Sequence, residues 1–223
     1  MKRAIAVAVG LAGIWLCWRV ACNGQIPSKE RVARSKVAAL GFKSACARSG
    51  IAWPPAKVTL LAFKQEKRLE VWAAGSVGAF SKIGEFPILA ASGTLGPKRR
   101  EGDKQVPEGE YGLTKLNPNS SYHLSIFVDY PNAIDVQRSK VSRSEMGGMI
   151  FVHGKAVSIG CIAIGDAAIE KVYGLCAVVR PANRKILICP VDFRSHPGFA
   201  LEGEEAWVEA MYSRLARKLA VLK

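Results

Sequence analysis

The chain has 223 residues, of which 49% are hydrophobic, and it carries a formal net charge of +14. This length and hydrophobic content exclude an intrinsically disordered protein and favour one globular domain with additional helices. Nucleic acid is a common partner of basic proteins, but the basic residues are dispersed and the N-terminus resembles an export sequence. We therefore expect no nucleic-acid partner.

The N-terminal segment, residues 1–22, has the composition of an export sequence. Two basic residues precede an uncharged apolar run from Ala4 to Trp18, and small residues surround Ala21. A full bilayer span needs about 20 apolar residues, so this run is short for one. We expect either a cleaved signal peptide or a retained anchor, which would form a membrane tether through residues 4–21.

Residues 23–55 predict a helical linker. Ser28 is a suitable N-cap, and apolar residues among lysines and arginines indicate one amphipathic helix ending near Ala47; these are Val32, Val37, Ala38, Leu40 and Phe42. The segment would act as a tether or a brace for the domain that follows.

Apolar runs predict a mainly β domain over residues 56–194. The expected strands are VTLLAF, LEVWAA, SYHLSIFVDY, GMIFVHG and ILICPVDF, and a helix capped by Asp166 lies between the last two. Alternation in SYHLSIFVDY places Tyr122 and Leu124 on one face and His123 and Ser125 on the other, which is polar enough to line a cleft. The long Gly-rich and charged stretch after Ala91 predicts a functional loop.

Residues 195–223 predict a C-terminal amphipathic helix from Leu201 to Leu222. Its first turn is acidic and its last turn is basic, as the helix dipole favours. We expect this helix to pack on its own domain, although docking on a membrane or a partner is an alternative. The predicted fold class is therefore a mainly β sandwich with short helices, flanked by N-terminal and C-terminal α-helices.

Four cysteines lie outside the export segment. Cys176 and Cys189 stand at the edges of two apolar runs and could form a disulfide in an oxidising compartment, which would leave Cys46 unpaired. The alternative is that Cys46, Cys176 and Cys189 are all buried thiols. Cys161 follows Gly160, and His153 ends a predicted strand eight residues earlier. A thiol becomes nucleophilic as a thiolate, which a neighbouring imidazole promotes. The spacing of histidines and cysteines favours neither a metal site nor a cofactor site.

The stretch HGKAVSIGC, which contains His153 and Cys161, resembles the active-site motif of the L,D-transpeptidase catalytic domain, also called the YkuD-like family. Together with SGTLGPKRREGDKQVPEGEYGL and YHLSIFVDYPN, it is similar to the YafK-like branch of murein L,D-transpeptidases. This resemblance covers about Lys57 to Phe193. Ile159 and Ala163 depart from the family pattern, in which histidine and arginine are frequent at those positions.

The resemblance implies roles for the motif residues. Cys161 would be the nucleophile, His153 its base, and Gly154 the source of a carbonyl that orients the imidazole. Ser158 would shape the loop, and the N–H groups of Gly160 and Cys161 would stabilise an oxyanion. The candidate substrate-binding residues are Lys98, Arg99, Tyr122 and His123.

The implied chemistry is acyl transfer on peptidoglycan stem peptides, through a thioester at the L-centre of meso-diaminopimelate. Transfer to an amine would make a transpeptidase, whereas transfer to water would make an L,D-amidase that releases an outer-membrane lipoprotein from peptidoglycan. We expect a periplasmic or inner-membrane-anchored protein of a Gram-negative cell envelope. The alternatives are a sortase-like enzyme using His123, Cys161 and Arg180, and a non-catalytic wall-binding module.

Overall fold

A computed structural model describes residues 27–222 of the chain. The expected export segment, with Cys17 and Cys22, lies outside these residues. Of the helices within 27–222, none is long and apolar enough to cross a membrane.

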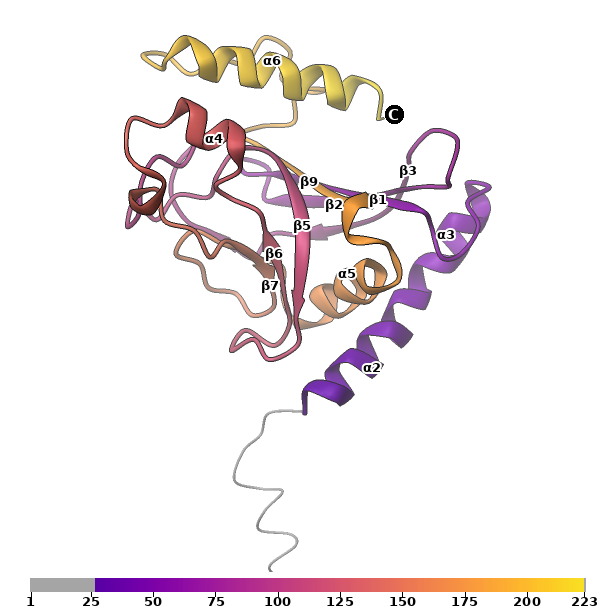
Figure 1. Cartoon of the computed structure of the whole chain (residues 1–223). Coiled ribbons are helices and arrows are strands. Elements are labelled where there is room, and N and C mark those ends of the chain that lie inside the picture. The colour runs from indigo at the N-terminus through magenta and orange to yellow at the C-terminus, as the bar shows by residue number, and fades with distance from the viewer. Residues whose placement is uncertain (1–26, 223) are drawn as a thin grey trace, which may run out of the picture.

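The described chain forms one nine-stranded sheet with helices on its faces and edges (Figure 1). The strands follow the order β3-β2-β1-β9-β5-β6-β7-β8-β4, and neighbours are antiparallel except for the parallel pairs β1–β9 and β7–β8. The strands are β1 Lys57–Phe63, β2 Arg68–Ala74, β3 Ser81–Pro87, β4 Ala90–Ala91, β5 Gly109–Asn117, β6 Ser125–Val128, β7 Phe151–His153, β8 Ile162–Ala163 and β9 Arg184–Cys189. The helices are α2 Ser28–Ala39, η1 Leu40–Phe42, α3 Lys43–Arg48, α4 Ala133–Arg138, η2 Arg143–Glu145, α5 Asp166–Val178, η3 Pro181–Asn183 and α6 Ala206–Ala220. The mainly β prediction with flanking helices is confirmed.

The central strands β1 and β9 are buried on both faces, which explains their continuous apolar sequences. Leu60 and Ile186 belong to a core cluster shared with α5 and strands β5 to β8. Leu61 and Leu187, the next residues along, belong to a second cluster under α6. The sheet therefore separates two apolar layers.

This separation decides between the two alternatives for the cysteines, in favour of buried thiols and against a Cys176–Cys189 disulfide. Cys176 lies on α5 in the first core cluster, whereas Cys189 faces α6 in the second. Both are buried free thiols, as is Cys46. Both cysteines lie next to apolar runs in the sequence, but these runs do not show which face of the sheet each cysteine occupies.

The predicted apolar face of the N-terminal segment is confirmed only in part: Phe42 is buried and Val32 packs against the core. Val37 and Leu40 are exposed, while Arg31, Ser35 and Ala39 face the domain at a spacing of four residues. This face crosses α5 so closely that a Cβ added to Gly174 would lie 1.9 Å from the Ser35 carbonyl oxygen. The buried face of α2 therefore consists of small and polar residues, where an apolar stripe was predicted.

Three expected helix boundaries also change. Pro27, not Ser28, is the N-cap of α2, and Gly165, not Asp166, is the N-cap of α5. The 3-10 turn η1 interrupts the predicted first helix. The last helix begins at Ala206 rather than Leu201, so most of the expected acidic first turn precedes the helix.

Helix α6 packs on the outer face of the sheet, above β9 and β1 (Figure 1). Its residues Val208, Met211, Leu215 and Leu219 recur at helical spacing and are buried there. Packing on its own domain was the expected arrangement.

A buried polar cluster connects α6 to the long segment before β5. The Tyr212 hydroxyl donates to Glu108 Oε2 at 2.6 Å, and Lys64 Nζ contacts Glu108 Oε1 at 2.9 Å. The Gly96 N–H also donates to Glu108 Oε1, at 2.8 Å. Burial lowers the pKa of Lys64, and the adjacent Glu108 carboxylate partly offsets this effect. The cluster therefore connects the segment from Gly96 to Glu108 with both α6 and the turn after β1.

Candidate functional site

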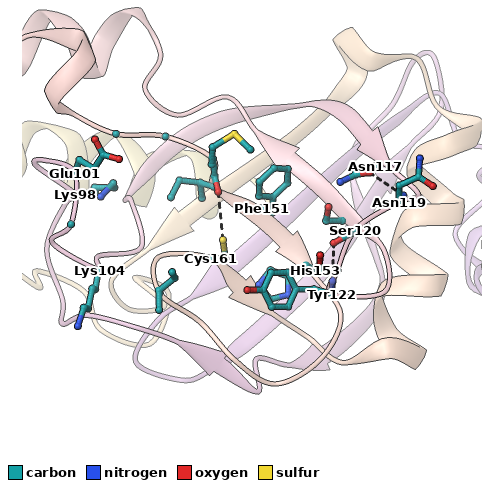
Figure 2. Close-up of a pocket in the computed structure, with 18 residues that line it drawn as sticks. Lys98, Glu101, Lys104, Asn117, Asn119, Ser120, Tyr122, Phe151, His153 and Cys161 are labelled. Atoms are coloured by element: carbon teal, nitrogen blue, oxygen red, sulfur yellow. Dashed lines mark hydrogen bonds between the residues drawn. The ribbon is translucent and has the colours of Figure 1, made fainter. Parts of the chain in front are cut away.

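A cavity of about 610 Å³ lies over the ends of β6 and β7, and both Cys161 and His153 line it (Figure 2). Its wall on one side is the segment from Lys98 to Lys104, and its wall on the other is the β5–β6 connection from Asn117 to Tyr122. Segments far apart in sequence therefore meet around the motif that the sequence analysis singled out.

The parallel pairing of β7 with β8 brings the two ends of the motif together. Val152 is opposite Ile162, and His153 is opposite Ala163, so Cys161 lies one residue before β8. The chain between them leaves the sheet and returns in a short excursion. Gly160 has a φ of +132°, a backbone conformation that other residues rarely adopt.

Gly154 lies where a side chain has no room. A Cβ at this position would come within 2.6 Å of the Tyr122 carbonyl oxygen and 2.5 Å of Asp166 Oδ1. Asp166 Oδ1 also accepts a hydrogen bond from the Lys155 N–H at 2.8 Å. The HG dipeptide is thus enclosed between the β5–β6 connection and the start of α5.

The His153 imidazole is held in a defined orientation. Its Nδ1 lies 2.6 Å from the Gly154 carbonyl oxygen, an acceptor, so Nδ1 carries the proton and Nε2 has a free lone pair. The residue is 2% exposed. Burial lowers the pKa of His153, and the hydrogen bond to Gly154 opposes this only in part. The ring is therefore a neutral base at neutral pH.

The Tyr122 ring covers the imidazole. The two ring centroids are 4.6 Å apart and tilted by 33°. Figure 2 shows the two rings beside Cys161 in the middle of the cavity. Tyr122, which is 42% exposed, thus forms part of the cavity wall next to the imidazole.

Cys161 is a partly buried thiol in its resting state. Its Sγ lies 3.7 Å from the Met149 carbonyl oxygen (Figure 2), to which the S–H donates. Burial raises the pKa of Cys161. Burial thus favours the neutral form of both the thiol and the imidazole.

Ser158 organises the loop that carries Cys161. Its Oγ donates to the Cys161 carbonyl oxygen at 2.7 Å and accepts from the Ser92 N–H at 3.2 Å. It also accepts from the Gly160 N–H at 3.2 Å. Ser158 thus shapes the loop before Cys161, and its Oγ already accepts the Gly160 N–H that the family resemblance made a candidate oxyanion donor.

Of the four candidate substrate-binding residues, the structure brings Tyr122 and Lys98 to the cavity. Lys98 is largely occupied, because its Nζ contacts Asp103 Oδ1 at 2.5 Å and the Arg100 carbonyl oxygen at 2.8 Å. Its side chain is only 6% exposed.

The other two candidates point elsewhere. Arg99 pairs with Glu204 and with Glu205, ahead of α6, rather than lining the cavity. His123 Nε2 lies 2.9 Å from Glu170 Oε1 on α5. His123 has a φ of +72°, which ends the strand alternation predicted through it and turns its side chain from the cavity.

Two charged residues at one end of the cavity were not among the candidates predicted from the sequence. Lys104 and Glu101 line it, and within residues 27–222 neither side chain has an ion-pair or hydrogen-bond partner (Figure 2). Asp103 fixes this loop by accepting hydrogen bonds from the N–H groups of Arg99, Arg100 and Gln105. Asp103 was a usable signal for a turn in this loop, since an Asp side chain that accepts from nearby backbone amides shapes a tight loop.

The sortase-like arrangement is not formed. His123 is bound to α5, and neither it nor Arg180, which follows α5, lines the cavity that contains Cys161. The only histidine that shares the cavity with Cys161 in the described residues is His153.

Comparisons with known proteins identify a family domain over the segment that contains His153 and Cys161. The family model described as "L,D-transpeptidase catalytic domain" matches residues 57–188. The YafK protein of Escherichia coli K12, whose name assigns it provisionally to the L,D-transpeptidases, is 33% identical over 114 residues. That alignment covers 50% of this chain and 44% of YafK, so the chain matches less than half of this curated relative.

Two solved structures have more distant similarity. The helical cell shape determining protein Pgp2 from Campylobacter jejuni is 21% identical with a TM-score of 0.49, over 80% of this chain and 78% of that one. L,D-transpeptidase 1 of Mycobacterium tuberculosis is 17% identical with a TM-score of 0.33, over 60% of this chain and 62% of that one.

Proposed function

The chain belongs to the L,D-transpeptidase catalytic domain family, and we propose that it is a cysteine-dependent acyltransferase acting on peptidoglycan stem peptides. One observation carries the proposal. Cys161 lines the same cavity as His153, whose Nδ1–H is bound by the Gly154 carbonyl so that Nε2 can accept a proton. A thiol and a neutral imidazole with a free Nε2 are the two groups that base-assisted attack by cysteine uses, and both are present in this cavity.

The first half-reaction would form a thioester at the L-centre of meso-diaminopimelate. As Cys161 Sγ attacks the carbonyl carbon, its proton passes to His153 Nε2, and the amide of Cys161 is the remaining candidate donor to the oxyanion. The C–N bond then breaks, and the imidazolium returns the proton to the leaving amine. The Gly154 carbonyl stabilises the imidazolium through Nδ1–H.

The second half-reaction would transfer the acyl group to an acceptor. An amine loses a proton to His153, attacks the thioester carbon and releases the Cys161 thiolate, which recovers the proton. Water in place of the amine gives hydrolysis, including release of a lipoprotein attached to peptidoglycan. The 33% identity to YafK supports the same family branch without distinguishing the two acceptors.

The free charges at one end of the cavity support a zwitterionic substrate group. The D-centre of meso-diaminopimelate carries an amine and a carboxylate, and Lys104 and Glu101 offer the two complementary charges. These residues replace Arg99 and His123 in the proposed recognition of the substrate. A cell-envelope location is part of the proposal, because peptidoglycan lies there.

The test uses diaminopimelate-containing tetrapeptide muropeptides and, separately, lipoprotein-linked muropeptides, with products read by mass spectrometry. Crosslinked dimers or exchanged terminal residues would identify a transpeptidase, and free stems released from the lipoprotein would identify a hydrolase. Cys161→Ala should abolish either reaction, while Cys46→Ala, which removes a buried thiol outside the cavity, should retain it. Tight muropeptide binding with no turnover would instead identify a wall-binding module.

A further inference from the structure

We propose that Arg31, on the N-terminal helix α2, is a positioning residue that holds the β5–β6 connection against the His153–Gly154 dipeptide. The inference rests on the proposed role of His153 as the base. Arg31 precedes the segment matched by the family model, residues 57–188. Membership of the family therefore does not by itself predict a role for Arg31.

Arg31 is a buried arginine that reaches across to the cavity wall. It is 6% exposed, and its Nη1 lies 2.5 Å from the His123 carbonyl oxygen and 3.2 Å from the Ser120 carbonyl oxygen. The Pro118 carbonyl oxygen is 3.5 Å from the same nitrogen. A guanidinium that donates to several carbonyls of one connection fixes its path, since each buried acceptor would otherwise lack a partner.

The connection held in this way is strained. His123 has a φ of +72°, which costs a non-glycine residue roughly 1–2 kcal/mol. Arg31 binds its carbonyl oxygen, and Glu170 on α5 lies 2.9 Å from its imidazole Nε2. Contacts from two helices therefore maintain a conformation that the backbone alone disfavours.

The same connection contacts the His153–Gly154 dipeptide at three points. The Tyr122 ring stacks on the His153 ring at 4.6 Å. The Tyr122 carbonyl oxygen lies so close to Gly154 that a Cβ on this glycine would be 2.6 Å from it. The Gly154 N–H also donates a hydrogen bond to the Leu124 carbonyl oxygen at 3.2 Å. Because the Gly154 carbonyl orients the His153 Nδ1–H, displacement of the connection would displace the imidazole as well.

Helix α2 is fixed well enough to serve as an anchor. Ser35 packs directly on Gly174 of α5, four residues from Arg31 on the same helix face. Glu170, the partner of His123, lies one turn before Gly174 on α5. Helices α2 and α5 thus support the cavity wall together, as their adjacent positions in Figure 1 show.

The experiment measures the rate of Cys161 alkylation by iodoacetamide at pH 7 in the full chain, quantified by peptide mass spectrometry. This readout needs no peptidoglycan substrate. We expect Arg31→Met to slow alkylation about tenfold, a fraction of the effect that a general base typically provides. Lys36→Met removes a positive charge from an exposed position on the same helix and should leave the rate unchanged.

A double-mutant comparison separates positioning from a general structural effect. In a His153→Ala background, Arg31→Met should cause no further slowing, because the positioned group is already absent. Slowing of the same size in both backgrounds, or no slowing in either, would overturn the proposal. If His153→Ala itself leaves alkylation unchanged, the assignment of the base fails, independently of turnover on muropeptides.

Ring ¹⁵N NMR of His153 provides a second measurement. The native chain should show the Nδ1-protonated tautomer, and Arg31→Met should lose it while Lys36→Met keeps it. If Arg31→Met does not fold, Arg31→Lys, which keeps the charge and one donor, should show a smaller change in the same direction. An unchanged tautomer in a folded Arg31 variant would contradict the proposal.

Discussion

Replacing Gly174 with alanine sets two opposing effects against each other. In a helix interior, alanine is favoured over glycine by about 1 kcal/mol. However, the new Cβ would lie 1.9 Å from the Ser35 carbonyl oxygen, a backbone atom, whereas ordinary contacts begin at 3.4 Å. Helices α2 and α5 would have to separate by about 1.5 Å at this point, and overpacking of this kind costs roughly 1–3 kcal/mol.

A further cost comes from the hydrogen bonds that depend on the position of α2. Separation of the helices withdraws Arg31 from its acceptors, and leaving buried acceptors unpaired costs about 1–3 kcal/mol. The unfavourable effects therefore exceed the gain, and we expect Gly174→Ala to lower the free energy of unfolding by about 2 kcal/mol. For a chain of this size the corresponding decrease in Tm is roughly 4–8 °C.

Urea denaturation of Gly174→Ala and Gly41→Ala measures this balance. Gly41 lies in the turn η1, and a Cβ there would meet nothing within 4 Å. Gly41→Ala should therefore be neutral or slightly stabilising. A Gly174→Ala protein as stable as the native chain would refute the close packing of α2 on α5, and with it the anchor for Arg31.

Three further predictions concern pH, the buried cluster under α6 and substrate recognition. Burial raises the pKa of Asp192, but hydrogen bonds and the charge of Arg194 outweigh burial and hold this pKa below its usual value. The stability that the Asp192 carboxylate contributes is therefore present above about pH 4 and is lost as the pH falls further. Asp192→Asn should flatten this part of a plot of Tm against pH. Tyr212→Phe leaves the buried Glu108 Oε2 without its donor and should lower the free energy of unfolding by about 1–3 kcal/mol in urea denaturation, whereas an unchanged midpoint would contradict the cluster. Lys104→Ala should raise KM about tenfold for muropeptides with a free D-centre carboxylate, since one charge-assisted hydrogen bond contributes roughly 1.5 kcal/mol or more. The KM for muropeptides with an amidated D-centre should not change. Equal effects on both substrates would rule out a contact between Lys104 and the D-centre carboxylate.

The strands were predictable because their sequences carry a direct signal of burial. After their first residues, β1 and β9 are almost continuously apolar, with Thr59 as the exception, and the structure buries both faces. The motif of His153 and Cys161 was also visible, since the two residues lie near each other in sequence and parallel pairing of β7 with β8 keeps them near each other in space.

The role of α2 was not predictable from periodicity. Its buried face consists of Arg31, Ser35 and Ala39, which is not an apolar stripe. Burial of Arg31 depends on carbonyl groups almost ninety residues later in the chain, and the fit at Ser35 depends on a glycine in α5. Such partners are visible only once the tertiary structure is known.

The charged residues near the cavity were equally ambiguous in sequence. Lys98, Arg99 and Lys104 occupy one basic loop; within residues 27–222, Lys98 and Arg99 pair with carboxylates, whereas Lys104 lines the cavity with no side-chain partner. Asp103 takes the Lys98 ammonium, and the acidic residues before α6 take Arg99. Acidic residues therefore determine which lysine or arginine is left to bind a substrate. Some of these acids are distant in the sequence, and Asp103 belongs to the same turn.

The most direct test of the proposed mechanism is to trap the covalent intermediate. The protein is mixed with a diaminopimelate-containing tetrapeptide muropeptide, quenched with acid within seconds and digested for peptide mass spectrometry. The account predicts an adduct on the Cys161 peptide, with the mass of the stem minus its leaving amino acid, and its accumulation should slow in His153→Ala. Turnover by Cys161→Ala, or an adduct on any other residue, would contradict it.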